Sequence, residues 1–285
     1  MDPRARPYRS VLYIPGSKPR ALEKARGLPV DAFIFDLEDA VSADEKVNAR
    51  ATLAEALAAG GYGPRTRIVR INGLDTEWGH ADAEAVCGMD ADVVLLPKVS
   101  SAKDVDALAA ITGDLPIWAM METAQGMLNA AQIAAHPLLT GMVMGTNDLA
   151  KELQTRFRPD RLPLMTGLGL CLLAAKAEGL IIVDGVYNAF KDDEGLEAEC
   201  AQGRDMGFDG KTLIHPAQVE VTNAAFAPSQ DEIDLARRQI AAFQEVEASG
   251  QGVAVVDGRI VENLHVVTAR QILEKAAMIE AMLGL

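Results

Sequence analysis

Residues 117–150 read IWAMMETAQGMLNAAQIAAHPLLTGMVMGTNDLA, and this stretch decides the fold. Two short apolar runs, IWAMM and GMVMGTN, each stop at a carboxylate, Glu122 and Asp148, and a helical pattern rich in small residues separates them. Strand, helix and strand in this order predict a right-handed parallel crossover, whose two strand ends point to the same face. Neighbouring strands lie about 5 Å apart. Glu122 and Asp148 should therefore face one point, a geometry suited to one hard divalent cation.

Similar apolar runs recur on both sides of this crossover. Most are continuously apolar rather than alternating, which is typical of strands buried on both faces, and helical patterns lie between them. The runs are 11–15, 32–39, 67–72, 92–98, 116–122, 141–148, 180–186 and 211–216. Strands alternating with helices in this way predict an α/β fold, a (β/α)8 TIM barrel. A doubly wound open sheet is the alternative.

The pattern changes near the C-terminus, so we predict a barrel domain over 1–226 and a C-terminal extension over 227–285. The extension reads as a helix, a short hairpin and a second helix. Its expected N-cap, first helix end and hairpin turn are Ser229, Gly250 and Asp257-Gly258. A barrel is complete without this segment, so we expect a small lid or an oligomer contact.

The net charge of −14 argues against nucleic acid as a partner, because a phosphate backbone needs a basic face. The charge is unevenly spread. Residues 1–26 contain seven basic and two acidic side chains, a local charge of seven minus two, or +5. Such a cluster is suited to a phosphorylated small molecule, although a solvated N-terminal arm is an equal alternative.

Cysteine use and hydropathy predict a cytoplasmic protein with no membrane partner. The three cysteines are scattered, with no spacing typical of a metal site or of a disulfide framework, which favours a reducing compartment. The first residues lack the apolar segment of a signal peptide. No run reaches the roughly 18 apolar residues that a membrane helix needs.

Polar and charged groups follow most of the predicted strands. In a TIM barrel the C-terminal ends of the strands form the active site, so these groups should converge on one rim. They are the segment PGSKPR and Asp36, Glu38, Asp39, Arg70, Asn72, Lys98, Glu122, Asn147, Asp148, Asp184 and His215.

Glu122 and Asp148 are the best candidate metal ligands. Two carboxylates with no histidine or cysteine nearby favour Mg²⁺ or Mn²⁺, with water and substrate completing an octahedron. As alternatives, Glu122 caps the helix that follows it, and Asp148 is the N-cap of the segment NDLAKEL.

Arg70 follows an apolar run, where a guanidinium is costly unless it is paired. Its natural use is a bidentate contact with an anionic oxygen, and the alternative is a structural salt bridge with Glu38 or Asp36. Glu38 and Asp39 either surround the water around the metal or hold Arg70, unless they are surface charges at a helix start.

Six sequence motifs resemble those of a known protein family and occur in the same order. They are RSVLYIPGSKPR (9–20), FIFDLEDAVSADEKVNAR (33–50), VRINGLDT (69–76), LLPKV (95–99), METAQG (121–126) and GTNDLA (145–150). The chain resembles the citrate lyase β-subunit-like CoA ester lyases of the HpcH/HpaI aldolase superfamily, with malyl-CoA and citramalyl-CoA lyases as relatives. The resemblance covers nearly the whole chain, including the tail.

The resemblance implies a role for each group at the rim. Mg²⁺ would be held by Glu122 and Asp148, and Arg70 would neutralise the developing enolate oxygen. Arg20 and Lys24 would contact the CoA phosphates, which agrees with the basic cluster. Apart from the resemblance, our mechanistic hypothesis is that backbone N–H groups of Gly145, Thr146 and Asn147 bind the carboxylate of the 2-oxo acid.

The resemblance also gives the tail a function. Family members are commonly trimers or hexamers in which the tail of one subunit reaches over the site of the next. That tail usually offers an aspartate for proton transfer, in a pattern like DGKMID. Here residues 257–262 read DGRIVE, so the position holds Glu262. A glutamate can transfer the same proton, but its extra methylene moves the carboxylate.

The implied activity is Mg²⁺-dependent carbon–carbon cleavage of a 3-hydroxyacyl-CoA, such as malyl-CoA or citramalyl-CoA, to acetyl-CoA and a 2-oxo acid. Four alternatives remain. They are a malyl-CoA thioesterase, a citrate lyase β-subunit acting on an acyl carrier protein thioester, a CoA-independent 2-oxo acid aldolase, and a non-enzymatic binding or assembly protein with a degenerate site, against which the intact set of Arg70, Glu122 and Asp148 argues.

Overall fold

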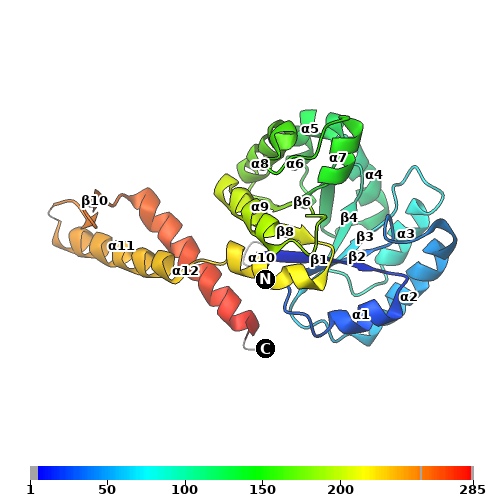
Figure 1. Cartoon of the computed structure of the whole chain (residues 1–285), viewed down its shortest axis with the longest axis horizontal. Helices are drawn as coiled ribbons and strands as arrows, with labels where there is room; N and C mark the ends of the chain where they lie inside the picture. The colour runs from blue at the N-terminus through cyan, green and yellow to red at the C-terminus, as the bar shows by residue number, and fades with distance from the viewer. Residues whose placement is uncertain (1–5, 251, 284–285) are drawn as a thin grey trace. The chain divides into compact units, whose positions relative to one another are not determined.

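Eight parallel strands close into a barrel in chain order within the residues that the computed structural model describes, 6–250 and 252–283 (Figure 1). The strands are β1 (Ser10–Pro15), β2 (Ala32–Asp36), β3 (Thr66–Arg70), β4 (Val93–Leu96), β5 (Ile117–Met121), β6 (Leu139–Met144), β7 (Ile181–Asp184) and β8 (Gly210–Leu213). Pairing of β1 with β8 leaves no open edge. The predicted TIM barrel is therefore confirmed, and the doubly wound alternative is wrong.

Helices surround this barrel, as Figure 1 shows for the part coloured blue to yellow. They are α1 (Pro19–Ala25), α2 (Lys46–Ala59), α3 (Gly79–Val86), α4 (Ala102–Thr112), α5 (Ala124–Leu128), α6 (Ala130–Ala134), α7 (Thr146–Glu152), α8 (Met165–Ala177), α9 (Asp193–Met206) and α10 (Val219–Phe226). The sequence pattern predicts one helix over 124–135. The structure has two, α5 and α6, because Asn129 leaves helical geometry at φ −99° and ψ 8°.

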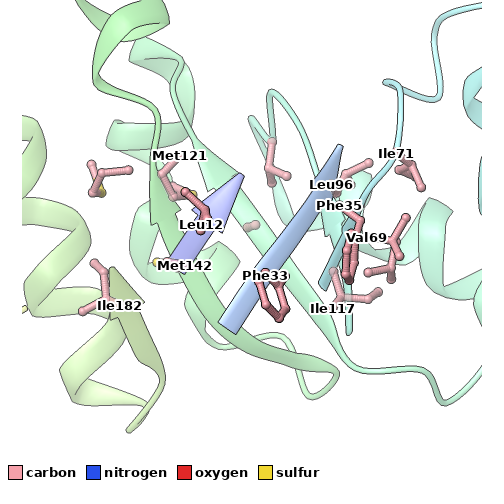
Figure 2. Close-up of a cluster of buried hydrophobic side chains, with 14 of the residues drawn as sticks. Leu12, Phe33, Phe35, Val69, Ile71, Leu96, Ile117, Met121, Met142 and Ile182 are labelled. Carbon is pink, nitrogen blue, oxygen red and sulfur yellow. The ribbon is translucent and has the colours of Figure 1, made fainter. Parts of the chain in front are cut away.

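Two apolar layers hold the barrel together, because successive strand side chains point to opposite faces. The outer layer packs between strands and helices (Figure 2) and includes Leu12, Phe33, Val69 and Met142. The inner layer fills the barrel and includes Val11, Ile34, Leu95, Trp118 and Val183. Gly141 makes room for the indole, since an added Cβ would lie 2.3 Å from the Trp118 ring.

Tyr8–Phe226 forms one compact unit, and a second unit begins at Ala227. The second contains α11 (Gln230–Ser249), the hairpin β9 (Val255–Val256) and β10 (Arg259–Ile260), and α12 (Asn263–Leu283). The predicted N-cap is confirmed, because the Ser229 hydroxyl accepts the N–H of Glu232. Gly250 ends α11 in the left-handed conformation. Asp257 and Gly258 both have positive φ, which a tight hairpin turn requires.

None of the helices in the described ranges combines the length and the apolar character needed to span a bilayer. All three cysteines are free thiols; Cys171 and Cys200 are buried and Cys87 is exposed.

Candidate active site at the C-terminal ends of the strands

A cavity of about 300 Å³ lies over the C-terminal ends of the barrel strands. Its floor includes Tyr13 and Met120, which belong to the inner layer of the barrel. The predicted site residues that line the cavity are Asp39, Arg70, Glu122, Gly145, Thr146, Asn147 and Asp148. Barrel closure thus brings together side chains that lie far apart in the sequence.

Arg70, the last residue of β3, is held by carboxylates from the segment after β2. Its Nε and Nη2 donate to the two oxygens of Asp36 at 2.7 and 2.6 Å, and its Nη1 lies 2.9 Å from Glu38 and 3.5 Å from Asp39. Burial opposes the Arg70 charge, but Asp36, Glu38 and the other groups around it together outweigh burial and keep the pKa of Arg70 well above its usual value. The salt bridges weighed from the sequence therefore exist, and Arg70 still lines the cavity.

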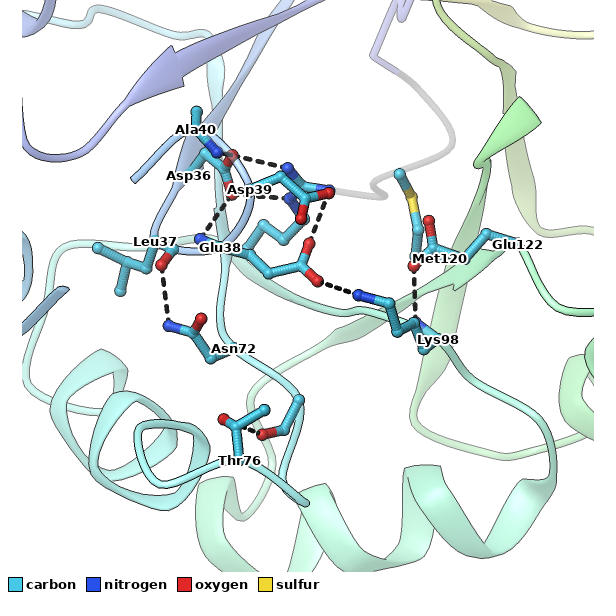
Figure 3. A network of polar contacts seen from close by, with 12 residues as sticks. Asp36, Leu37, Glu38, Asp39, Ala40, Asn72, Thr76, Lys98, Met120 and Glu122 are labelled. Carbon is cyan, nitrogen blue, oxygen red and sulfur yellow. Dashed lines mark hydrogen bonds and ion pairs between the residues drawn. The ribbon is translucent and has the colours of Figure 1, made fainter. Parts of the chain in front are cut away.

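Asp36 is itself fixed in place. Its two oxygens accept the backbone N–H groups of Glu38 and Ala40, each at 2.9 Å (Figure 3). Burial disfavours the charged carboxylate, but the Arg70 guanidinium and the two backbone N–H groups together outweigh burial and lower the pKa of Asp36. The side chain of Arg70 therefore has one preferred orientation in the cavity.

Lys98 connects Glu38, on the Arg70 side of the site, with Glu122. From the sequence, Lys98 is only one of several polar residues at strand ends. Its backbone N–H donates to Glu122 Oε1 at 2.8 Å, and its ammonium donates to Glu38 Oε1 at 2.6 Å (Figure 3). Lys98 adopts φ 53°, a left-handed conformation that is costly for a residue with a Cβ. The sequence around Lys98 contains no pattern that predicts this conformation.

Glu122 projects from the end of β5 and is 2% exposed. Burial, followed by repulsion from Glu38 and Asp148, raises the pKa of Glu122 to about 7. Gly145 leaves the room for this side chain, because an added Cβ would lie 2.4 Å from Glu122 Cβ and Oε2. The capping alternative for Glu122 is wrong, since Thr123 caps α5 by accepting the N–H of Gly126.

Asp148 lies in the first turn of α7, whose N-cap position is Gly145, so the N-cap alternative for Asp148 is also wrong. Its carboxylate is half-buried and lines the cavity with Glu122. Within the described ranges no side chain is recorded as donating a hydrogen bond to it, so its oxygens remain available.

The donor set fits a divalent cation. Five carboxylates and two cationic side chains lie close together here, which leaves a formal excess of three negative charges. They are Asp36, Glu38, Asp39, Glu122 and Asp148, with Arg70 and Lys98. No group of three or more histidine, cysteine or acidic side chains that could hold a metal occurs in the described residues. A cation here would be coordinated by two protein ligands, with water or substrate in its remaining positions. Mg²⁺ is commonly coordinated in this way.

The backbone around Gly145 differs from expectation. The N–H of Gly145 donates to the Met121 carbonyl at 2.9 Å, so the hypothesis that this N–H binds a substrate carboxylate is wrong. This N–H takes part in the hydrogen bonding between the parallel strands β5 and β6, so it is not available to a ligand. Thr146 and Asn147 line the cavity, and the Asn147 amide exchanges two hydrogen bonds with Asn188, at 3.1 and 2.8 Å.

The N-terminal basic cluster is smaller than its composition suggests. Three of its members form ion pairs: Arg9 with Asp31, Lys18 with Glu45 and Arg26 with Glu23. Arg4 lies outside the described residues. Arg20 and Lys24 are exposed on α1. Four residues apart on one helix, they are neighbours on the same face.

Glu262 belongs to the second unit, where it directly precedes α12. Its backbone N–H donates to His265 Nδ1 at 2.9 Å, and the residue is exposed. Among residues 6–250 and 252–283, no side chain donates a hydrogen bond to its carboxylate, in contrast to Asp36 and Glu38 in the barrel.

Known proteins resemble this chain along almost its whole length. The profile described as HpcH/HpaI aldolase/citrate lyase matches residues 9–216, and that described as C-C bond lyase of the TIM-barrel fold matches residues 165–280. The (3S)-malyl-CoA thioesterase of Cereibacter sphaeroides (strain ATCC 17029 / ATH 2.4.9) is 72% identical over 281 residues, 99% of either chain. The citrate lyase subunit beta of Leuconostoc mesenteroides subsp. cremoris is 34% identical, over 94% of this chain and 93% of its own.

Solved structures show the same likeness. The protein CitE of Mycobacterium tuberculosis, in complex with magnesium, acetoacetate and coenzyme A, superposes with a TM-score of 0.80 and 32% identity. The match covers 96% of this chain and 99% of CitE. The citrate lyase beta subunit of the same organism, complexed with oxaloacetate and magnesium, has a TM-score of 0.72 and 34% identity, over 80% of this chain and all of its own.

Proposed function

This chain belongs to the HpcH/HpaI aldolase/citrate lyase family, and on that premise we propose that it hydrolyses the thioester of (3S)-malyl-CoA to malate and coenzyme A. The near-complete match to a malyl-CoA thioesterase carries the proposal. The family and its citrate lyase relatives support a carbon–carbon lyase with the same fold. The same residues must therefore be able to serve in either reaction.

Glu122 and Asp148 are the proposed ligands of Mg²⁺, with Mn²⁺ as a substitute. Both carboxylates line the cavity, and the surplus of negative charge around them supports a divalent cation. When bound, Mg²⁺ would orient the hydroxyl and carboxylate oxygens at the malyl end and neutralise charge on them. Thr146 and Asn147 line the same cavity and are proposed contacts for that carboxylate.

Arg70 is the proposed partner of the thioester carbonyl oxygen. That oxygen gains negative charge when water adds to the carbonyl carbon, and a buried donor that is already oriented stabilises such charge strongly. A guanidinium carries five N–H donors, and the close contacts with Asp36 and Glu38 occupy three of them. Arg70 thus keeps donors for the substrate while its orientation stays fixed.

Hydrolysis adds water to the carbonyl carbon, breaks the carbon–sulfur bond and returns a proton to the sulfur of coenzyme A. We propose Glu262 of a neighbouring subunit as the group that moves this proton, because a glutamate there can act as an acid or a base. Asp39 and Glu38 would hold Arg70 during the step. Arg20 and Lys24, exposed on α1, are proposed to hold the CoA phosphates.

A second candidate, cleavage of malyl-CoA to acetyl-CoA and the 2-oxo acid glyoxylate, is favoured by the citrate lyase relatives. It would place negative charge on the same carbonyl oxygen, as an enolate, so Arg70 would act alike in both reactions. The two reactions differ at sulfur. Hydrolysis frees a thiol, whereas carbon–carbon cleavage leaves the thioester intact.

The test is to incubate the purified chain with (3S)-malyl-CoA and Mg²⁺ and to follow free thiol, malate, acetyl-CoA and glyoxylate together. Equal amounts of thiol and malate support the thioesterase. Acetyl-CoA and glyoxylate without thiol would refute it in favour of the lyase. If neither pair forms, citramalyl-CoA, acyl carrier protein thioesters and CoA-free 2-oxo acid aldol substrates test the remaining alternatives.

The proposal includes a homotrimer or hexamer in the cytoplasm, with the second unit of each subunit serving a neighbour. Sedimentation velocity on the full chain tests the assembly. Mixing Glu262→Gln subunits with Arg70→Lys subunits tests the sharing, because mixed oligomers would regain activity only if sites are built from two chains.

A further inference from the structure

Tyr13 lies at the floor of the cavity and has no role in the mechanism above. It is the fourth residue of β1, on the same face as Val11, so its side chain points into the barrel. Its hydroxyl lies 3.8 Å from the sulfur of Met120 on β5. Since β1 and β5 stand opposite each other in a closed barrel of eight strands, the ring reaches across the barrel mouth.

The Tyr13 side chain contacts Arg70 through its ring and Met120 through its hydroxyl. The Arg70 guanidinium covers the Tyr13 ring, with Cζ 4.9 Å from the ring centroid, a cation–π contact. Glu122, the proposed metal ligand, lies two residues after Met120, just past the end of β5, and lines the same cavity. Tyr13, Arg70 and Glu122 all line the cavity.

The hydroxyl is a strong donor with a weak partner. A thioether sulfur accepts hydrogen bonds poorly, and in the described part of the chain Met120 is the one partner recorded for this hydroxyl. An O–H donor left without a good acceptor forgoes the stabilisation of a full hydrogen bond. An incoming oxygen would supply the missing acceptor.

The phenol stays protonated, as a donor must. Loss of water around the ring raises the pKa of Tyr13 well above its usual value, and the Arg70 charge offsets this only in part. The group is therefore a neutral O–H donor throughout the working pH range.

We propose that the Tyr13 hydroxyl donates a hydrogen bond to the thioester carbonyl oxygen beside Arg70. The two donors together then share the negative charge that forms on that oxygen. This inference rests on the proposed function, because it takes a thioester as the substrate. A substrate oxygen placed there replaces the Met120 sulfur as the acceptor and needs no movement of β1.

The test is Tyr13→Phe, which removes one oxygen and keeps the ring beneath Arg70. Removing one donor to a developing oxyanion lowers kcat by about 10²-fold. KM should change little, because the contact strengthens in the transition state. The upward shift in melting temperature on adding Mg²⁺ should match that of the parent, because the variant leaves Glu122 and Asp148 in place.

Tyr62→Phe is the matched control. Its hydroxyl donates to the Leu22 carbonyl at 3.2 Å in the outer layer, away from the cavity, so this variant should lose stability and keep kcat. A Tyr13→Phe enzyme with kcat within about threefold of the parent would overturn the inference, being far short of the loss of one oxyanion donor. So would loss of the Mg²⁺ shift, since that outcome means a structural role.

Failure of the proposed function would look different. A parent chain that forms acetyl-CoA and glyoxylate without thiol refutes the thioesterase but leaves the carbonyl oxygen as the charged atom. The comparison of Tyr13→Phe with the parent is then made on that reaction, with the same criteria.

Discussion

Glu122→Gln removes the charge of the proposed metal ligand and keeps its shape, so it isolates the cost of a buried carboxylate. In the metal-free parent, burial raises the pKa of Glu122 from 4.5 to about 7. The folded protein then binds this proton more tightly than the unfolded chain. The contribution of Glu122 to stability must therefore fall as pH rises from about 4.5 to about 7, and stay level above.

The size of the effect follows from the same values. A displacement from 4.5 to about 7, at about 1.4 kcal/mol per pH unit, corresponds to about 3 kcal/mol. Glu122 is 2% exposed, so solvent screening reduces this figure little. Glu122→Gln should therefore be more stable than the metal-free parent by up to about 3 kcal/mol at pH 8. Near pH 4.5 the two proteins should be nearly equal.

The assay is urea unfolding of both proteins in a metal chelator at pH 5 and pH 8, with Glu55→Gln on the exposed face of α2 as the control. The control should show no such pH-dependent gain. Mg²⁺ at pH 8 should stabilise the parent and leave Glu122→Gln unchanged, because the amide is a poor ligand for it. A stability difference that is the same at both pH values would refute the reasoning, as would a parent more stable than the variant at pH 8.

Three further substitutions test the rest of the site. Arg70→Lys should lower kcat by at least 10²-fold, because an ammonium cannot make the two-point contact with Asp36. An unchanged melting shift with Mg²⁺ is expected, and unchanged turnover would remove Arg70 from the mechanism. Lys98→Gly should be more stable than Lys98→Ala by about 1 kcal/mol in thermal unfolding, since only glycine adopts φ 53° freely; equal stabilities would contradict the strain. Gly145→Ala should weaken Mg²⁺ binding at least tenfold by calorimetry, because its Cβ displaces Glu122; parent-like affinity would place the ion elsewhere.

The local patterns predicted the fold well because each element carries its own signal. Continuous apolar runs marked the eight strands, and the Ser229 cap and the Asp257-Gly258 turn lie where short-range rules place them. Asn129 shows the limit of this reasoning. Its neighbours are good helix formers, so the break between α5 and α6 had no strong local signal.

The candidate site was predicted in part for the same reason. Arg70, Glu122 and Asp148 are charged groups at the ends of apolar runs, which is a conspicuous position, and all three line the cavity. Tyr13 was overlooked, because an aromatic residue inside a strand looks like ordinary core. Gly145 was assigned a free N–H, because strand pairing beyond the end of a run cannot be seen in one segment.

The order of apolar runs alone was enough to indicate a closed barrel and the end at which its chemistry should lie, because both follow from the direction of parallel strands. The sequence did not determine which charged side chains would pair with one another. The pairs Arg70–Asp36, Lys98–Glu38 and Arg9–Asp31 join separate strand ends, and their distances exist only once the barrel closes. The raised pKa of Glu122 has the same origin, because its burial and its repulsion from Glu38 depend on packing between segments distant in the chain.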